Sequence, residues 1–348
     1  MNLQIIALLG QDGLSNGAIY ALVALAIILV FSVTRVMLIP LGEFVAFSAL
    51  TMGGMQSERP VLIGWLVLAL ALASASVDGW ALWRSHRAGI PTRKPWKLLV
   101  WPLYGLLAVV VLGQLPLMKM SILVQALLTL AVITPLGPLM YRLFFQPVAH
   151  ASGLLLMIIA IAVHVSLVGV GLLIFGAEGS RTLPFSEASL ELGEMSISSQ
   201  SIWVLVVSLT LMGALYAAFE RTLYGKALRA TAANQLGAQL MGISPVLAGK
   251  ISFALGTFMC ALSGILIAPL TTLYYDSGFI ISLKGFVSAV IGGLGSYPVA
   301  ALGAMVVGLV ESFSTFWASA YKEAIVFTLI LPFLLWRSLK SGTQEEEH

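Results

Sequence analysis

Three ionisable side chains stand inside long apolar stretches of the sequence: Glu43, Lys284 and Glu311. A charged group within a membrane segment is costly, and it marks a substrate path, a gate or an internal ion pair. Glu43 follows Pro40 and Gly42, while Lys284 and Glu311 bound the apolar segment 284–311. These residue types favour a path for a polar solute through an apolar bundle. The alternative for each charge is a pairwise salt bridge inside the bundle.

The segment 284–311 is interrupted near its centre by three glycines and by Pro298. Glycine permits backbone angles that other residues avoid, and proline has no amide to donate, so we expect the helix to open between Gly292 and Pro298. At membrane depth such backbone must be covered by protein or line a water-filled cavity. A tight loop between two short spans is the alternative. The candidates for path or gating residues are Tyr20, Gly42, Glu43, Lys284, Gly292, Gly293, Gly295, Ser296 and Glu311.

Other chemistry has little support in the sequence. His86, His150 and His164 are scattered, and no His-Glu-x-x-His, paired aspartates or Ser-His arrangement occurs. A phosphate-binding Gly-x-x-x-x-Gly-Lys-Ser/Thr loop is also absent from the sequence. The lone Cys260 excludes an intrachain disulfide and a cysteine-based metal cluster. We therefore expect no catalytic site, no metal site and no nucleotide site in this chain.

Composition determines the class of protein. Of 348 residues, 59% are hydrophobic and only 9% are charged, whereas about a quarter of a soluble protein is charged. Apolar runs near the roughly 20 residues of a spanning helix favour helices over barrel strands of about 10 residues. The N-terminus lacks the pattern of a cleaved signal, so the first apolar segment should remain. The prediction is an all-α, polytopic transmembrane helical bundle, a single transmembrane domain 1–348, with about 10–11 spans and two broken helices.

The apolar runs place the spans. We expect residues 1–10 to lie along the membrane surface or to lead into the first helix. We expect 176–201 to form an acidic solvated loop and 340–348 to be a short acidic tail. Residues 37–50 form the earlier broken stretch. The expected spans are 13–33, 61–82, 98–117, 121–141, 154–175, 202–219, 251–273, 281–291, 299–317 and 324–336.

The basic residues predict the orientation. The loop 84–97 holds five Lys or Arg and no acid, and short positive loops stay in the cytoplasm. Placing Arg35, that loop, Arg142, the segment 221–250 and the C-terminus inside accounts for most of the 18 basic residues, with the N-terminus outside. Because topology explains these charges, nucleic acid is not an expected partner. Contact of the loop with anionic lipid is an alternative, and four tryptophans flank the loop like an interfacial belt. They are Trp80, Trp83, Trp96 and Trp101.

The segment 220–250 differs from a solvated loop. It is rich in alanine, Leu236, Leu240 and Met241 give it an apolar side, and Gly242 followed by Pro245 stops it. A short cytoplasmic helix of this kind suits a groove on a partner, and an interfacial helix without a partner is the alternative. The candidate coupling residues are Gly225, Lys226, Arg229, Ala232, Ala233, Asn234, Leu240 and Gly242.

With these residues in place, the chain resembles the permease subunits of branched-chain amino acid ABC importers, in the LivH-like branch. The resemblance lies in Gly17-Ala-Ile-Tyr-Ala-Leu, in 225–243 and in 276–322. It implies a multi-pass subunit of the bacterial inner membrane that carries branched-chain or other hydrophobic amino acids or related small molecules. It also implies a second, LivM-like permease, two cytoplasmic ATPases that bind the ATP and Mg²⁺, and a periplasmic substrate-binding protein. No cofactor is implied for this chain.

Departures from the family pattern leave the substrate open. Where the family shows Asn-Phe-Ala-His-Gly-Glu, this chain keeps Gly42 and Glu43 and lacks the Asn and the His. The usual Ala-Glu pair of the coupling segment reads Ala232-Ala233, so an electrostatic contact with the ATPase is missing. The pair of spans at 61–117 is predicted to be extra, as a lipid or partner contact.

The resulting hypothesis is that closure of the ATPases moves the 225–243 helix and that the attached spans rock around the two broken stretches. The nearest alternative is a secondary transporter of a small polar solute, which needs no docking helix. An intramembrane enzyme has almost no sequence support.

Overall fold

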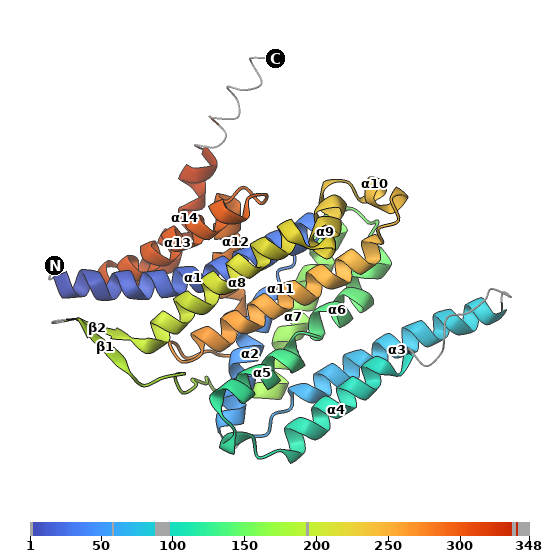
Figure 1. Ribbon diagram of the computed structural model, residues 1–348, viewed down its shortest axis with the longest axis horizontal. Helices are drawn as coiled ribbons and strands as arrows, with labels where there is room; N and C mark the ends of the chain where they lie inside the picture. The colour runs from blue at the N-terminus through green and yellow to red at the C-terminus, as the bar shows by residue number, and fades with distance from the viewer. Residues whose placement is uncertain (1–2, 58, 88–97, 193–194, 336–338, 340–348) are drawn as a thin grey trace.

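In the computed structural model, the described residues 3–57, 59–87, 98–192, 195–335 and 339 form a bundle of helices with one short β-hairpin (Figure 1). This confirms the all-α class and the polytopic bundle. The hairpin, β1 (Ser189–Leu192) paired with β2 (Met195–Ser198), lies in the segment expected to be a loop. The helices are α1 (Leu3–Thr34), α2 (Leu41–Gln56), α3 (Ile63–Arg87), α4 (Val100–Gln114), α5 (Ile122–Ile133), α6 (Leu136–Met140), α7 (Gly153–Phe175), α8 (Ser199–Arg221), α9 (Leu223–Ala233), α10 (Gln235–Leu240), α11 (Pro245–Ile267), α12 (Ser277–Ile291), α13 (Tyr297–Trp317) and α14 (Lys322–Thr328).

Seven helical stretches of the described residues are long and apolar enough to cross a membrane: α1, α3, Ile122–Val148, α7, α8, α11 and α13. The chain is thus a multi-pass membrane protein. The count is below the 10–11 spans expected, because α2, α4, α12 and α14 are shorter than the roughly 20 residues that a straight crossing needs.

The bundle has two distinct ends. At the α9–α10 end, an Arg35 guanidinium nitrogen donates to the Ala232 carbonyl at 3.0 Å, which joins the end of α1 to α9. At the β1–β2 end, the Gln11 side-chain amide donates to the hydroxyls of Ser198 and Ser201 at 3.3 and 3.0 Å. The spans run between these two ends.

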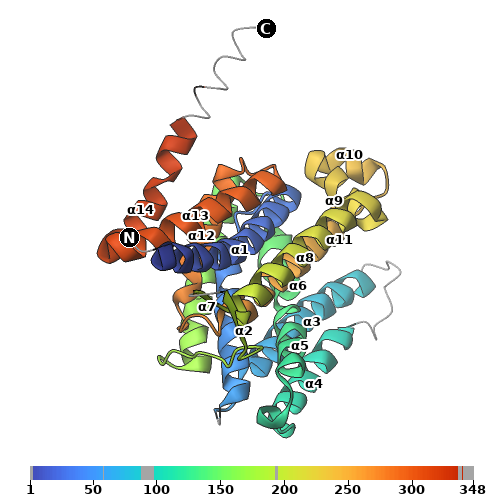
Figure 2. The same ribbon diagram turned by 60° about the vertical axis from the view of Figure 1, so that its left-hand side comes forward.

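Helix α1 is the centre of the bundle and lies among α8, α11, α12 and α13 (Figure 2). It packs antiparallel to α13, with Gly13 against Leu309 and Gly17 against Met305. A Cβ at Gly308 would overlap backbone atoms of Gly13 and Gly17. Small residues are what permit such close approach of helices within a membrane.

The first broken stretch is present, and Val36, Leu38 and Pro40 within it are buried. Helix α1 ends at Thr34, Arg35 takes a left-handed φ of 59°, and residues 35–40 are not helical. The Ser282 hydroxyl of α12 donates to the Ile39 carbonyl at 3.0 Å. Gly42, at the start of α2, lies directly against the backbone of Gly278 in α12. Helix α12 thus covers the break, as backbone outside a helix requires in a membrane bundle.

The second break is a tight turn. Helix α12 ends at Ile291 and α13 begins at Tyr297, as the glycines and Pro298 predict. Gly293 and Leu294 have left-handed φ values of 70° and 56°, and Gly292 packs on Ala300. The two helices therefore fold back on each other as a hairpin, which is the alternative that the sequence left open.

The segment 220–250 contains two short helices where one was expected. The side chain of Asn234 interrupts the run, because its carbonyl oxygen accepts from the Gly237 amide at 2.9 Å and caps α10. Gly242 ends the pair with a φ of 82°, and residues from Pro245 onward belong to α11. The predicted stop signals are correct, but the single continuous helix is wrong.

The expected pair at 61–117 is present as α3 and α4, which pack on each other. Arg84 and Arg87 of the basic loop belong to the last turns of α3. Residues 88–97 of that loop, with Trp96, and the tail 340–348 lie outside the described residues.

We predict that Gly308→Val lowers the stability of the bundle by about 1–3 kcal/mol, since the new side chain must separate α13 from α1. The measurement is thermal unfolding of the purified protein in detergent. Gly169→Val is the matched control, because Gly169 lies on exposed α7 surface with open space around it. Equal melting temperatures for the two variants would contradict the proposed close packing.

Candidate functional site

A polar cavity of about 410 Å³ lies toward the β1–β2 end, where α1, α12, α13 and α14 meet. Three of the predicted path residues, Tyr20, Lys284 and Glu311, line it together. Its other charged lining residues are Asp12, Lys322 and Glu323. Apolar side chains, including Leu9, Ile280 and Ile281, complete the wall. A cavity of this size and mixed lining suits a small amphipathic solute.

A charged triad stands at the centre of this cavity. The Lys284 ammonium lies 2.5 Å from Glu311 Oε1 and 3.1 Å from Glu323 Oε1. Lys284 and Glu311 are 4% and 7% exposed, while Tyr20 presents its ring 5.7 Å from the ammonium. Two carboxylates thus share one cation. The second oxygens of both carboxylates have no hydrogen-bond donor among the described residues, so the triad can accept bonds from a further cationic or N–H group.

The α12–α13 hairpin creates this triad. Its tight turn sets an antiparallel register in which Gly292 faces Ala300 and Ile291 faces Gly303. Following the same register back along both helices brings Lys284 opposite Glu311. The sequence indicated both residues but placed them at the two ends of one broken helix. It missed Glu323, because that residue approaches only after the turn at Ser319–Tyr321.

Glu43 belongs to a different place in the bundle. Its side chain is fully buried, and the His164 Nδ1 atom of α7 lies 3.0 Å from Glu43 Oε1. The imidazole ring of His164 packs on Phe279 of α12, with ring centroids 4.9 Å apart. Glu43 thus has a polar neighbour inside the bundle, which sequence reasoning missed because it treated His164 as an isolated residue.

The remaining path candidates lie elsewhere. Gly292, Gly293, Gly295 and Ser296 form the turn at the α9–α10 end, next to Tyr297. The ring of Tyr297 stacks on Phe219 at the end of α8, with centroids 5.6 Å apart. The structure therefore divides the predicted path residues among the cavity, the Glu43–His164 pair with the neighbouring Gly42, and this turn.

The α9–α10 segment has a buried side and an exposed side. Gly225 packs against Ala218 and Phe219 of α8, and Arg229 pairs with Glu220 at 2.6 Å. Ala232 is half-buried, whereas Lys226, Ala233, Asn234 and Gly242 are exposed, as is Arg229. Large apolar side chains also stand in the open, from 69% to 84% exposed: Leu223, Tyr224, Leu236, Leu240 and Met241.

Metal ligation is not indicated by the side chains that the structure describes, since no three His, Cys, Asp or Glu residues are grouped there.

Comparison with known proteins gives the family. Residues 100–334 match the family described as branched-chain amino acid transport system / permease component. The matched range includes α4 and leaves out α3. No solved structure matches the chain.

Individual relatives agree with this assignment. The high-affinity branched-chain amino acid transport system permease protein BraD of Pseudomonas aeruginosa is 27% identical over 239 residues, which are 67% of this chain and 77% of BraD. The LivH permease protein of Escherichia coli K12 is 28% identical over 204 residues, 56% of this chain and 65% of LivH. A probable LivH permease of Methanocaldococcus jannaschii is 29% identical over 217 residues, 60% of this chain and 66% of that protein.

These matches confirm the resemblance found in the sequence, and they describe a transport subunit and not an enzyme. The family match covers most of the chain, including the cavity-forming hairpin and the α9–α10 segment, and the chain therefore belongs to the family of branched-chain amino acid transport system permease components.

Proposed function

We propose that this chain is one of two permeases in an ABC importer of branched-chain or other hydrophobic amino acids or related small molecules. A second, LivM-like permease completes the translocation path, two cytoplasmic ATPases drive it, and a periplasmic binding protein delivers the cargo. The family match supports a component of a multi-subunit system over a free-standing secondary transporter. The observation that carries the proposal is the separation of a polar cavity at one end from an exposed apolar segment at the other.

The exposed face of α9–α10 supports the ATPase contact. Exposing Leu236, Leu240 and Met241 to water is unfavourable by roughly 25 cal/mol for each Å² of apolar surface. A partner that buries this face removes the cost, and large exposed apolar patches mark such interfaces. The ion pair of Arg229 with Glu220 and the bond from Arg229 to the Phe219 carbonyl fix α9 to α8. A push on this segment is thereby transmitted to a spanning helix.

The positions of the charges support the orientation. Arg35, Arg84, Arg87, Arg142, Arg221, Lys226 and Arg229 are basic residues of the described chain toward the α9–α10 end. By the positive-inside rule this end faces the cytoplasm, and the β1–β2 end with the start of α1 faces the periplasm. The polar cavity then lies on the side from which a binding protein releases its cargo.

The triad supports a role in the path. An amino acid in the cavity offers an ammonium group to the free oxygens of Glu311 and Glu323, while its apolar side chain meets Ile280 and Ile281. Lys284 keeps the two carboxylates together when the cavity is empty. Glu43 and His164 do not line this cavity. A gating role for them rests on their position beside α12.

We predict that Glu311→Gln lowers uptake of radiolabelled leucine at least tenfold when the whole importer is reconstituted in vesicles. Removing one charge leaves Lys284 with only the partly exposed Glu323, and breaking a buried pair costs about 3–5 kcal/mol. Stability is measured in parallel by thermal unfolding.

The double variant Lys284→Met/Glu311→Gln separates the two interpretations of the pair. It removes both buried charges, so it should recover most of the stability. Under the path hypothesis uptake stays low in the double variant. Recovery of uptake together with stability would leave the pair with a structural role only.

We also predict that Leu240→Glu releases the ATPases from the membrane complex and abolishes uptake, since a carboxylate cannot be buried in an apolar groove without large cost. The measurement is co-purification of the ATPases with the tagged permease. Leu183→Glu is the matched control, an exposed leucine at the β1–β2 end. Full ATPase retention in the Leu240 variant, or equal loss in both variants, would defeat the docking role of α9–α10.

A further inference from the structure

Helix α3 has an unusual end. Its 25 residues span about 37 Å at 1.5 Å per residue, longer than the roughly 30 Å hydrocarbon core. Its last turns therefore reach the headgroup region at the α9–α10 end. There Trp80 and Trp83 are 60% and 51% exposed, and Arg84 and Arg87 are also exposed. These four side chains lie on the exposed face of α3 and not against the interior of the bundle.

Arg84 and Arg87 each make a cation–π contact with the tryptophan four residues earlier in α3. The guanidinium carbon of Arg84 lies 4.4 Å from the ring centroid of Trp80, and that of Arg87 lies 4.0 Å from the ring of Trp83. Both pairs are four residues apart, so one helix face carries all four side chains within an arc of about 100°. Stacking holds the guanidinium groups beside the rings, and it leaves their N–H groups free to donate at the edges.

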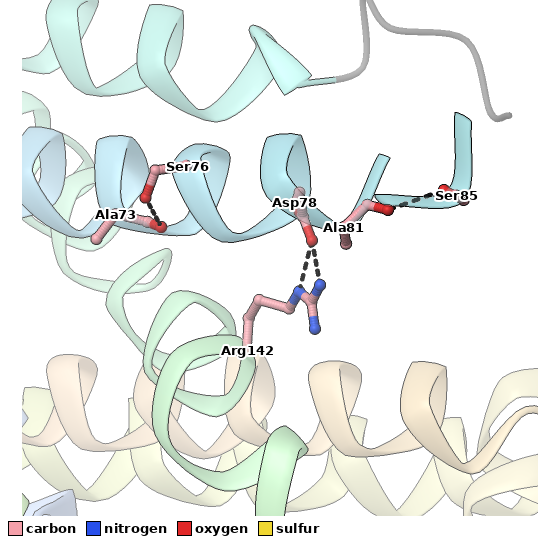
Figure 3. Close-up of polar contacts among 6 residues, drawn as sticks. All are labelled: Ala73, Ser76, Asp78, Ala81, Ser85 and Arg142. Carbon is pink, nitrogen blue, oxygen red and sulfur yellow. Dashed lines mark hydrogen bonds and ion pairs between the residues drawn. The ribbon is translucent and has the colours of Figure 1, made fainter. Parts of the chain in front are cut away.

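The one acid of α3 is already neutralised on the opposite side. Asp78 lies about 160° around the helix from Trp80 and forms an ion pair with Arg142 from the π-helical turn Tyr141–Phe145 (Figure 3). This pair fixes α3 to the bundle and removes the acid that would compete for Arg84 and Arg87. The outer face of the helix end therefore carries two positive charges that have no acidic partner among the described residues, next to two tryptophan rings.

We propose that the Trp80–Arg84 and Trp83–Arg87 pairs form a binding site for the phosphate headgroup of an anionic phospholipid. Guanidinium groups bind phosphate oxygens through parallel N–H bonds, and tryptophan rings lie at headgroup level beside the acyl chains. The site chemistry is a phosphodiester with net negative charge, such as phosphatidylglycerol, at the membrane surface. Assigning it to the cytoplasmic leaflet rests on the proposed orientation, whereas the binding itself does not.

The test is lipid retention by the intact importer, measured by native mass spectrometry during titration with phosphatidylglycerol or with zwitterionic phosphatidylcholine. Wild-type protein should retain phosphatidylglycerol preferentially. Arg84→Gln/Arg87→Gln should weaken that retention about tenfold or more and leave phosphatidylcholine unchanged, since each basic residue near the surface contributes on the order of 1 kcal/mol. Trp80→Leu/Trp83→Leu keeps the charges and should also weaken it, because the stacked geometry is lost.

A matched control distinguishes a specific site formed by these four side chains from a general effect of positive charge. Arg221→Gln removes an exposed charge at the same end that is not among the arginines stacked on tryptophan, and it should retain phosphatidylglycerol as the wild type does, whereas Arg84→Gln alone should weaken retention. Equal loss in the Arg84 and Arg221 single variants would overturn the site, as would unchanged retention in the Arg84/Arg87 variant. Loss of the second permease from that variant, with lipid retention unchanged, would assign the surface to a protein partner instead. None of these readouts requires transport, so they stand apart from the proposed cargo.

Discussion

The structure depends on one constraint, which is that backbone leaving a helix inside the bundle must find new partners within the protein. Residues 35–40 leave α1 and reach α2 in a non-helical path, and α12 supplies the cover. Ser282 donates to the Ile39 carbonyl, and the facing glycines Gly42 and Gly278 let the two backbones meet. A side chain at either glycine would hold α12 away and leave that carbonyl without its donor, at a cost of about 1–3 kcal/mol.

Because these contacts fix α12 against residues 35–42, they also fix the positions of the other residues of α12. Lys284 lies two residues beyond Ser282, the residue that contacts the break, so the helix that covers residues 35–40 also presents the ammonium of the cavity. Its far end enters the turn Gly292–Ser296, and the next residue, Tyr297, stacks on Phe219 beside α9. A continuous set of contacts thus joins the exposed α9–α10 segment to the cavity at the other end. Gly293 and Leu294 are consecutive residues with left-handed φ values, and they reverse the chain direction between α12 and α13.

The sequence was sufficient to predict helix ends, because these depend on the residues next to them in the chain. Gly292 caps the end of α12 and Pro298 lies in the first turn of α13, where the sequence predicted the break, and Gly242 has the left-handed φ of a helix stop. Partners distant along the chain could not be derived this way. His164 meets Glu43 because α7 crosses α2, and Glu323 joins Lys284 only through the fold of α14. The split at Asn234 was visible in principle, since asparagine is a preferred N-cap, but the surrounding alanines favoured a continuous helix.

Exposed apolar residues have different explanations on the α3–α4 pair and on the α9–α10 segment. Along α3 and α4, exposed side chains such as Leu72 and Leu107 lie within apolar helices, of which α3 is long enough to cross a membrane, so acyl chains are one cover available to them. Leu236 and Leu240 belong to short helices outside the spanning segments, where water is the alternative. Equal exposure is therefore compatible with lipid cover for α3 and α4, and it supports the proposed protein partner for α9–α10. The polar residues agree with this division, because the stacked arginines of α3 offer charge to a headgroup, whereas Arg229 on α9 is already paired with Glu220.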